Sequence, residues 1–280
     1  MIPPKAKVSA CARRPVRRAA DILIALLVLG PGAAPILAQP AEKLPAAAAV
    51  LDRYVEVTGG AAAYARLNNR KTTGTVEMVG QGLKGTLTTC SARPAKLHSL
   101  VEIEGIGTIE KGTDGKVVWE KSVLLGPQIK EGDEKALLLR SAFFDGTVNW
   151  RKVFKKAECQ AVEAVDGKPC YKLVLTAAEG PAETRYYDKQ SGLLVKVAFD
   201  LETPMGVIPV ESYFDEYKRV DGVLIPHQIR QVVLGMQETR IVLQRVEHNV
   251  EMPKDRFELP AEIRALLEKP KASQPAKHKP

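Results

Sequence analysis

The residue types that usually carry out catalysis or bind metals are sparse in this sequence and far apart. The four histidines, His98, His227, His248 and His278, stand mostly in strand-like segments, and no H-E-x-x-H motif or pair of C-x-x-C motifs occurs. Such spacings bring metal ligands together, so we predict no metal site. The G-x-S-x-G elbow of serine hydrolases and the P-loop are absent as well, and no motif predicts a cofactor.

Four carboxylates are the remaining candidates for acid–base chemistry. Glu102, Glu104, Glu110 and Glu120 fall on neighbouring predicted strands and could therefore meet in space. Two carboxylates that meet can act as general acid and general base. We prefer the interpretation that these carboxylates lie on a strand face that is exposed to solvent. We therefore expect a protein that is not an enzyme, with a hydrolase as the least favoured alternative.

The densest group of large apolar side chains surrounds one predicted helix. The only two tryptophans bracket residues 131–145, a helical segment with Asp133 as its expected cap. One interpretation is plain core packing, and the other is that these side chains line a hydrophobic cavity between the helix and a sheet. The candidate cavity residues are Trp119, Leu137, Leu138, Phe143, Phe144 and Trp150.

Most of the chain alternates with the period of a β-strand. Leu193, Val195, Val197, Phe199 and Leu201 alternate with more polar residues, which predicts a strand with one dry face. The other predicted strands begin near residue 71 and include 83–89, 97–104, 107–111, 116–121, 157–165, 169–177, 182–188, 208–219, 223–234 and 238–249.

Three Asp-Gly pairs separate successive strand-like segments, at residues 114–115, 166–167 and 221–222. Asp-Gly readily adopts the positive backbone angles of a tight hairpin, so neighbouring strands should pair in sequence order. About ten strands exceed what a flat sheet holds comfortably, so the sheet should curl strongly or close. The fold class is mainly β with a few helices, built on one curved antiparallel sheet.

The helices should cover this sheet. An apolar stripe that includes Val50, Leu51, Tyr54 and Val55 predicts a helix that ends at Gly59-Gly60, and a second short helix should follow at 61–67. The apolar helix at 131–145 must bury its face, and the open side of a curled sheet is the obvious place. Together these helices would form a lid.

The two ends of the chain carry most of its excess positive charge. Residues 1–38 have the basic start, short apolar run and small-residue end of a cleaved signal peptide, the alternative being an uncleaved membrane anchor. A single domain should span 39–268, followed by a disordered basic tail at 269–280. Without the signal peptide, 35 basic and 32 acidic residues remain, so we expect no nucleic-acid partner.

Export permits disulfides, but three cysteines remain after cleavage of the signal peptide, an odd number. If Asp166-Gly167 forms a two-residue turn, Cys159 faces residue 174 rather than Cys170. A Cys159–Cys170 bridge is therefore unexpected, and we interpret Cys90, Cys159 and Cys170 as buried apolar side chains.

Several segments resemble the outer-membrane lipoprotein-sorting proteins of the LolA/LolB-like superfamily. The resemblance spans nearly the whole mature chain, and the order and spacing of its pieces carry it. These pieces are residues 50–64, 186–194, 221–226 and 246–253, with Phe257 and Pro260.

The resemblance implies an unclosed half-barrel whose concave face is covered by helices, and carriage of acyl chains of lipoproteins or free lipids through the periplasm. The resemblance assigns no catalytic or ligand-binding role to any residue of this sequence. The leading hypothesis is thus a soluble, monomeric periplasmic carrier of a hydrophobic ligand. The alternative is an interaction module that binds an envelope membrane protein through a sheet edge or the outer face.

Overall fold

The computed structural model describes residues 43–203 and 206–268, so the predicted signal peptide and basic tail lie outside the described residues. These ranges contain five helices: α1 (Ala47–Val57), α2 (Gly60–Ala65), α3 (Gly132–Ala142), α4 (Trp150–Val153) and α5 (Ala261–Glu268). The strands are β1 (Asn69–Val79), β2 (Leu83–Ala92), β3 (Lys96–Ile103), β4 (Gly107–Thr113), β5 (Val118–Ser122), β6 (Gly126–Lys130), β7 (Phe154–Val165), β8 (Lys168–Ala177), β9 (Glu183–Asp188), β10 (Leu194–Thr203), β11 (Gly206–Val220), β12 (Val223–Val233) and β13 (Gln237–His248).

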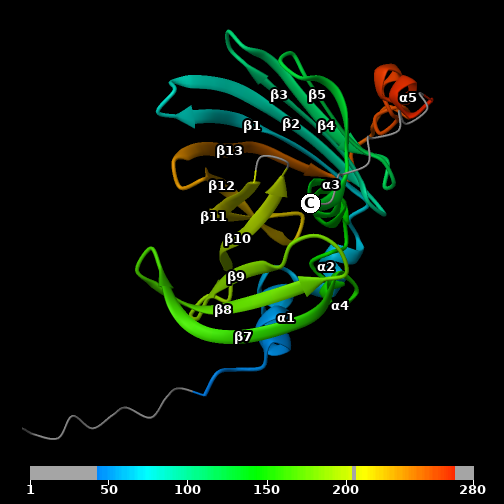
Figure 1. The fold of residues 1–280 in the computed structure, drawn as a ribbon. Helices are drawn as coiled ribbons and strands as arrows, with labels where there is room; N and C mark the ends of the chain where they lie inside the picture. The colour runs from blue at the N-terminus through cyan, green and yellow to red at the C-terminus, as the bar shows by residue number, and fades with distance from the viewer. Residues whose placement is uncertain (1–42, 204–205, 269–280) are drawn as a thin grey trace, which may run out of the picture. The chain divides into compact units, whose positions relative to one another are not determined.

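All thirteen strands belong to one antiparallel sheet that curves strongly and does not close (Figure 1). Its order is β6-β5-β4-β3-β2-β1-β13-β12-β11-β10-β9-β8-β7, so every neighbouring pair is consecutive in sequence except β1 and β13. The predicted fold class, a mainly β chain with one unclosed antiparallel half-barrel, is confirmed. Each predicted segment forms a strand, and the short β6 is the one described strand that no predicted segment covers.

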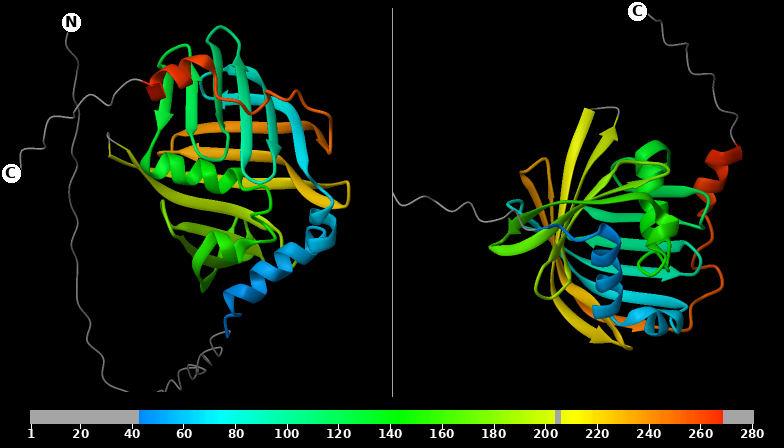
Figure 2. Two further views of the ribbon diagram at one scale, coloured as in Figure 1. Left: turned by 90° about the vertical axis from the view of Figure 1, so that its right-hand side faces the viewer. Right: turned by 90° about the horizontal axis from the view of Figure 1, so that it is seen from below.

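The pairing of β1 with β13 makes β6 and β7 the two outer edges of the sheet. These edge strands are consecutive in the chain, so the segment that joins them must travel from one edge to the other. That segment contains α3 and α4, and α3 lies across the concave face between the β4–β5 region and β10 (Figures 1 and 2). The expected covering helix is therefore a consequence of the strand order.

Helices α1 and α2 pack on the concave face through one apolar stripe each. Ala47, Val50 and Leu51 of α1 are buried in a core cluster with residues of β7 to β10. At the end of α1 the backbone NH of Leu224 donates to the Thr58 carbonyl at 2.8 Å. Gly59 has a φ of 138°, and a Cβ there would lie 2.6 Å from the Gly222 carbonyl oxygen, which explains the glycine at this helix end.

The Asp-Gly turns agree with the prediction at two of three places. Asp166-Gly167 and Asp221-Gly222 have positive φ at both residues and join directly paired strands. Between β4 and β5, Thr113 pairs with Val118, so a four-residue loop replaces the expected two-residue turn. There the Asp114 carboxylate accepts hydrogen bonds from the backbone NH groups of Lys116 and Val117, which stabilises the longer loop.

Two local expectations are wrong. Asp133 does not cap α3, because the helix begins one residue earlier and the Asp133 carboxylate accepts instead from the backbone NH of Glu202 at 3.3 Å. Cys159 faces Leu173 rather than residue 174, since a bulge between Cys159 and Ala161 shifts the register by one. Cys170 faces Glu163, and the three described cysteines are free.

The hairpin loops on one margin of the sheet carry exposed apolar side chains. Because neighbouring strands are antiparallel, the β1–β2, β3–β4, β5–β6, β8–β9, β10–β11 and β12–β13 loops all fall on the same margin, here called the open margin. The three Asp-Gly segments fall on the opposite margin. Of the eight large hydrophobic side chains that are exposed in the described residues, six lie at or beside open-margin loops: Val123, Leu124, Leu125, Val207, Leu234 and Met236.

A buried histidine joins β1, β13 and the β11–β12 turn near the other margin. The side chain of His248, at the end of β13, is 1% exposed. Arg70 of β1 donates through Nε to His248 Nε2 at 3.0 Å, and His248 Nδ1 lies 2.9 Å from the Asp221 carboxylate. A guanidinium cannot accept a hydrogen bond, so Nε2 is unprotonated and Nδ1 donates to Asp221. Burial is the main cause that lowers the pKa of His248, and the positive charge of Arg70 adds to it while Asp221 opposes it.

This arrangement predicts a loss of stability in mild acid. Because the pKa of His248 is below 6.5 in the folded state, its contribution to stability is complete above pH 6.5 and is lost as the pH falls through the lowered value. The melting temperature should therefore fall from pH 7.5 to pH 5.5 more steeply in the unsubstituted protein than in His248→Gln. Equal slopes in thermal denaturation of the two proteins would contradict this assignment.

Candidate functional site: an apolar cavity beneath α3

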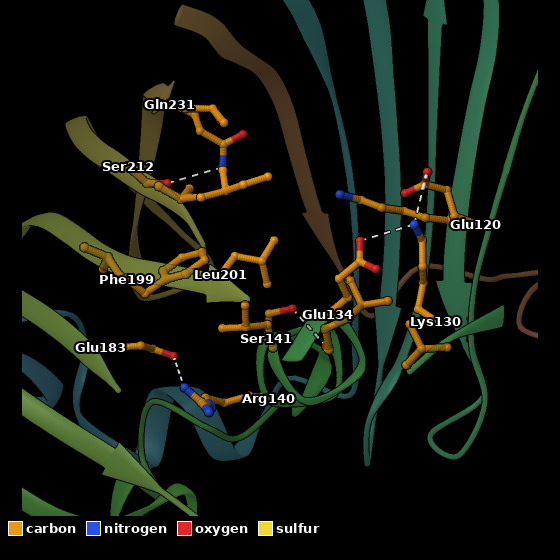
Figure 3. A pocket seen from close by; sticks show the side chains of 18 of the residues that line it. Glu120, Lys130, Glu134, Arg140, Ser141, Glu183, Phe199, Leu201, Ser212 and Gln231 are labelled. Atoms are coloured by element: carbon orange, nitrogen blue, oxygen red, sulfur yellow. Dashed lines mark hydrogen bonds and ion pairs between the residues drawn. The ribbon is translucent and has the colours of Figure 1, made fainter. Parts of the chain in front are cut away.

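A cavity of about 560 Å³ lies between α3 and the concave face of the sheet (Figure 3). Strands β10, β11 and β12 supply an apolar wall, and α3 supplies Leu137 and Leu138 from the other side. The register places these wall residues on one face, since Val197 pairs with Ser212 and Phe199 pairs with Val210. The apolar wall consists of Val197, Phe199, Leu201, Ile208, Val210, Phe214 and Val233.

Helix α3 is attached to the open margin near both its ends. Near its start, Asp133 accepts from the Glu202 backbone at the end of β10. Near its end, Arg140 donates to the backbone carbonyls of Glu179 and Pro181 in the β8–β9 loop, at 2.6 and 3.1 Å. The helix thus spans the concave face as a lid, with its own attachments on two different hairpins.

The first charged group of the cavity is electrically balanced. Lys130 lies 3.2 Å from Glu134 and 3.8 Å from Glu120, and Lys111 pairs across strands with Glu120. Figure 3 shows Glu120, Lys130 and Glu134 together, on the far side of the cavity from Phe199 and Leu201. Two cations and two anions make this group neutral.

The second charged group is unbalanced. Arg140 and Arg185 both bind one carboxylate, Glu183: Arg140 Nη1 contacts Oε1 at 2.5 Å, and Arg185 donates through Nε and Nη2 to Oε2 at 2.8 and 2.6 Å. The side chains of Arg140 and Glu183 are each 7% exposed. Burial acts to raise the pKa of Glu183, but Arg185 and Arg140 outweigh it, so the carboxyl pKa lies below its usual value. This group carries one excess positive charge.

Three of the six residues predicted from the sequence border the cavity. Leu137 and Leu138 face it from α3, and Trp119 borders it from β5. The Trp119 ring, however, lies 6.0 Å from the His98 ring. Residues alternate faces along a strand, so the ring packs on the convex face, opposite to Val118 and Glu120.

The other three predicted residues lie outside the cavity because α3 ends at Ala142 and the chain turns away. Phe143 follows the helix in an extended conformation, and Phe144 packs near α2 with Arg70 and Arg93 each 5.9 Å from its ring centre. Trp150 begins α4, is buried in the α1 core cluster, and donates through Nε1 to Asp52 at 3.0 Å.

Sequence reasoning found part of the wall and missed the rest. The expected dry face of the strand at 193–201 does supply Val197, Phe199 and Leu201, but a bulge after Leu194 places Val195 against a different cluster, with Val165, Cys170 and Tyr186. Ile208, Val210 and Val233 were missed as wall residues, although their strands were predicted. Arg140 stands out only as a cation within an apolar helix, and nothing local pairs it with Glu183 and Arg185.

The four candidate carboxylates do not converge. Glu110 lies 2.7 Å from His98 and 3.1 Å from Lys121 on the convex face, whereas Glu120 lies at the cavity on the other face. Glu102 accepts from Thr86, and Glu104 is exposed. Among residues 43–203 and 206–268, no three histidine, cysteine or acidic side chains gather in a way that could hold a metal ion.

Comparison with solved structures places this fold in a known class. No family model and no curated protein matches the sequence. The structure resembles a DUF1329 family protein from Desulfovibrio piger (15% identity, TM-score 0.51) over 77% of this chain and 98% of that one. It also resembles a LolA superfamily protein from Nitrosomonas europaea (11% identity, TM-score 0.52) over 76% of this chain and 98% of that one.

The chain has a LolA-like fold. The resemblance found in the sequence is confirmed at this level. In the described part of the chain, no helix has the length and apolar character needed to cross a bilayer.

The buried arginine pair predicts a large cost for removing its shared carboxylate. Glu183→Gln would leave two guanidinium groups without an anionic partner, and we expect a loss of about 3 kcal/mol in the free energy of unfolding. As a matched control, Glu158→Gln removes the carboxylate of an exposed pair with Lys156, and its cost should stay below about 1 kcal/mol. Urea denaturation of both variants measures the difference. Similar small losses in the two would show that the Glu183 group is not an important internal ion pair.

Proposed function

We propose that this protein is a soluble periplasmic carrier that holds the acyl chains of a lipid or lipoprotein in the cavity beneath α3, and that it is not an enzyme. The observation that carries the proposal is the apolar wall formed by β10, β11 and β12 opposite Leu137 and Leu138. A volume of about 560 Å³ falls within the range of about 300–1,000 Å³ that is usual for small-molecule sites.

The physical basis of binding would be burial of hydrocarbon. Each methylene that leaves water contributes about 0.8 kcal/mol, so even a chain of about 14 carbons gains enough to be held without covalent attachment. The lid is attached through Asp133 and Arg140, by hydrogen bonds to hairpin loops and by the buried ion pair of Arg140 with Glu183. Because these contacts include no strand-pairing hydrogen bond, α3 could separate from the wall to admit a chain without disturbing the sheet, provided that the Arg140–Glu183 ion pair opens.

The proposed location rests on the sequence and on the fold. Residues 1–38 have the pattern of a signal peptide, and a solved structure of this fold belongs to the LolA superfamily. No cysteine follows directly after the predicted cleavage position, which favours a carrier that is free in the periplasm over one with a lipid anchor.

A variant that fills the cavity tests the proposal. Val197→Trp would place an indole in the apolar wall, and we expect it to weaken binding of a fluorescent fatty acyl probe at least tenfold by occupying its space. The matched control is Val242→Trp, since Val242 is 40% exposed and pairs with Gln228 on the opposite face of the sheet. Fluorescence titration measures the affinity, and circular dichroism checks that both variants fold.

Binding that is unchanged in Val197→Trp, or lost equally in both variants, would show that the chain does not occupy this cavity. Native mass spectrometry of protein purified from its own periplasm provides the direct identification of the cargo. An extractable lipid or lipopeptide would support the carrier, whereas a bare protein that takes up no acyl probe would exclude it.

One observation favours a second function, docking onto an envelope membrane protein. The exposed side chains at the open margin include Val123, Leu124 and Leu125, which are 66%, 81% and 65% exposed on a single loop. Exposed apolar groups of this kind mark interaction surfaces. This function would use the margin and its neighbouring edge strand β6, without requiring cargo in the cavity.

The docking function predicts a partner that is lost when this loop becomes polar. Replacing Val123, Leu124 and Leu125 with serine should abolish stoichiometric recovery of one envelope protein in an affinity purification, and acyl-probe binding should remain unchanged. Recovery of the same partner by the substituted protein would rule out this surface.

A further inference from the structure

The cavity has two chemically different ends, and only one of them lacks internal charge balance. The group of Lys111, Lys130, Glu120 and Glu134 is neutral. At the other group, Arg140 and Arg185 face a single carboxylate, Glu183. A buried charge without a partner is unfavourable, so an excess cation beside an apolar wall is a natural place for an anion.

Arg140 donates to three groups of the protein, whereas Arg185 donates to one carboxylate. Arg140 donates to Glu183 and to two backbone carbonyls of the β8–β9 loop. Arg185 donates from both Nε and Nη2 to one oxygen of Glu183. Its side chain is 23% exposed and borders the cavity, so part of its guanidinium remains available to a ligand.

Tyr187 lies next to this place, in the core cluster formed by α1 and β7 to β10 rather than in the lining of the cavity. It lies two residues from Arg185 on the same face of β9, and its residue is completely buried. Its hydroxyl has no hydrogen-bond partner of acceptable geometry among the described residues, although the charge of Arg185 acts on it. A buried hydroxyl without a partner is unusual, because such groups normally make at least one hydrogen bond.

The aromatic surroundings fix the position of this group. The guanidinium carbon of Arg185 lies 4.9 Å from the centre of the Phe154 ring, and that of Arg140 lies 5.6 Å from the same centre. Stacking on a ring leaves the edge of a guanidinium free to bind a carboxylate or phosphate. The geometry therefore holds Arg185 ready for an anion at the end of the apolar wall.

We propose that the cargo is an amphiphile with a single anionic group, which binds at Arg185, beside the Tyr187 hydroxyl, while its hydrocarbon chain lies along the wall of β10, β11 and β12. The inference rests on the proposed carrier function and specifies its ligand class. The anionic group can be a carboxylate or a phosphate, since a guanidinium and a hydroxyl donate to both. A neutral chain of equal length would gain the burial of hydrocarbon without the charge-assisted bonds.

The test compares two probes that differ only in the end group, dodecanoate and dodecanol, each below the concentration at which it forms aggregates. Isothermal titration with the full mature protein should show that dodecanoate binds at least tenfold more tightly. In Arg185→Gln this preference should fall below threefold while the affinity for dodecanol is retained. Dodecyl phosphate in place of dodecanoate tells whether the site prefers phosphate to carboxylate.

A second variant covers the case in which Arg185→Gln does not fold. Tyr187→Phe removes one hydroxyl and keeps the ring in its core cluster, and it should reduce the preference for dodecanoate by twofold to fivefold. Equal affinities for the two probes in the unsubstituted protein, or a preference that survives both substitutions, would overturn the anionic-cargo inference and leave the carrier function intact. Failure of both probes to bind would instead overturn the carrier function itself.

Discussion

The pairing of β1 with β13 is the constraint on which the rest of the structure depends. Without it, the chain would consist of two separate antiparallel meanders, β1 to β6 and β7 to β13. With it, thirteen strands form one sheet whose edges are consecutive in sequence, so their connection must cross a face. Strongly twisted sheets of this size curl, and the crossing segment is buried on the concave side. The His248, Arg70 and Asp221 contacts reinforce this pairing where β13 ends.

The cavity follows from that crossing. Helix α3 has to bury its apolar side chains, but its polar attachments lie near its ends, where Asp133 and Arg140 bind hairpin loops and Arg140 also binds Glu183 at the start of β9. Leu137 and Leu138 therefore face the wall of β10 to β12 across a space instead of filling it. Helices α1 and α2, by contrast, are packed into closed clusters, and they are joined to the sheet by the tight contact between Gly59 and Gly222.

The same helix brings a charge into this space. Arg140 reaches Glu183 from α3, and Arg185 reaches it along β9, so one carboxylate is shared between two elements that are about forty residues apart in sequence. Sharing one anion between two cations secures the lid and at the same time leaves an incomplete charge balance beside an apolar wall. A structural ion pair and a candidate binding group thus occupy one place, which is why the stability of Glu183→Gln and the ligand preference of Arg185→Gln are separate measurements.

The sequence by itself determined the local structure. Period-two alternation, the Asp-Gly turns at 166–167 and 221–222 and the stripe on α1 depend on nearest neighbours, so the strands, most hairpins and the helices α1 to α3 were predictable.

The tertiary structure alone decided which side chains meet. Phe143, Phe144 and Trp150 are as apolar as Leu137, yet the end of α3 at Ala142 directs them elsewhere. A single bulge moves Val195 away from Val197, and Arg140 acquires its partners only through the crossing from β6 to β7. Local patterns specify the conformation of a segment, but contacts between distant segments depend on strand order and register, which no local pattern contains.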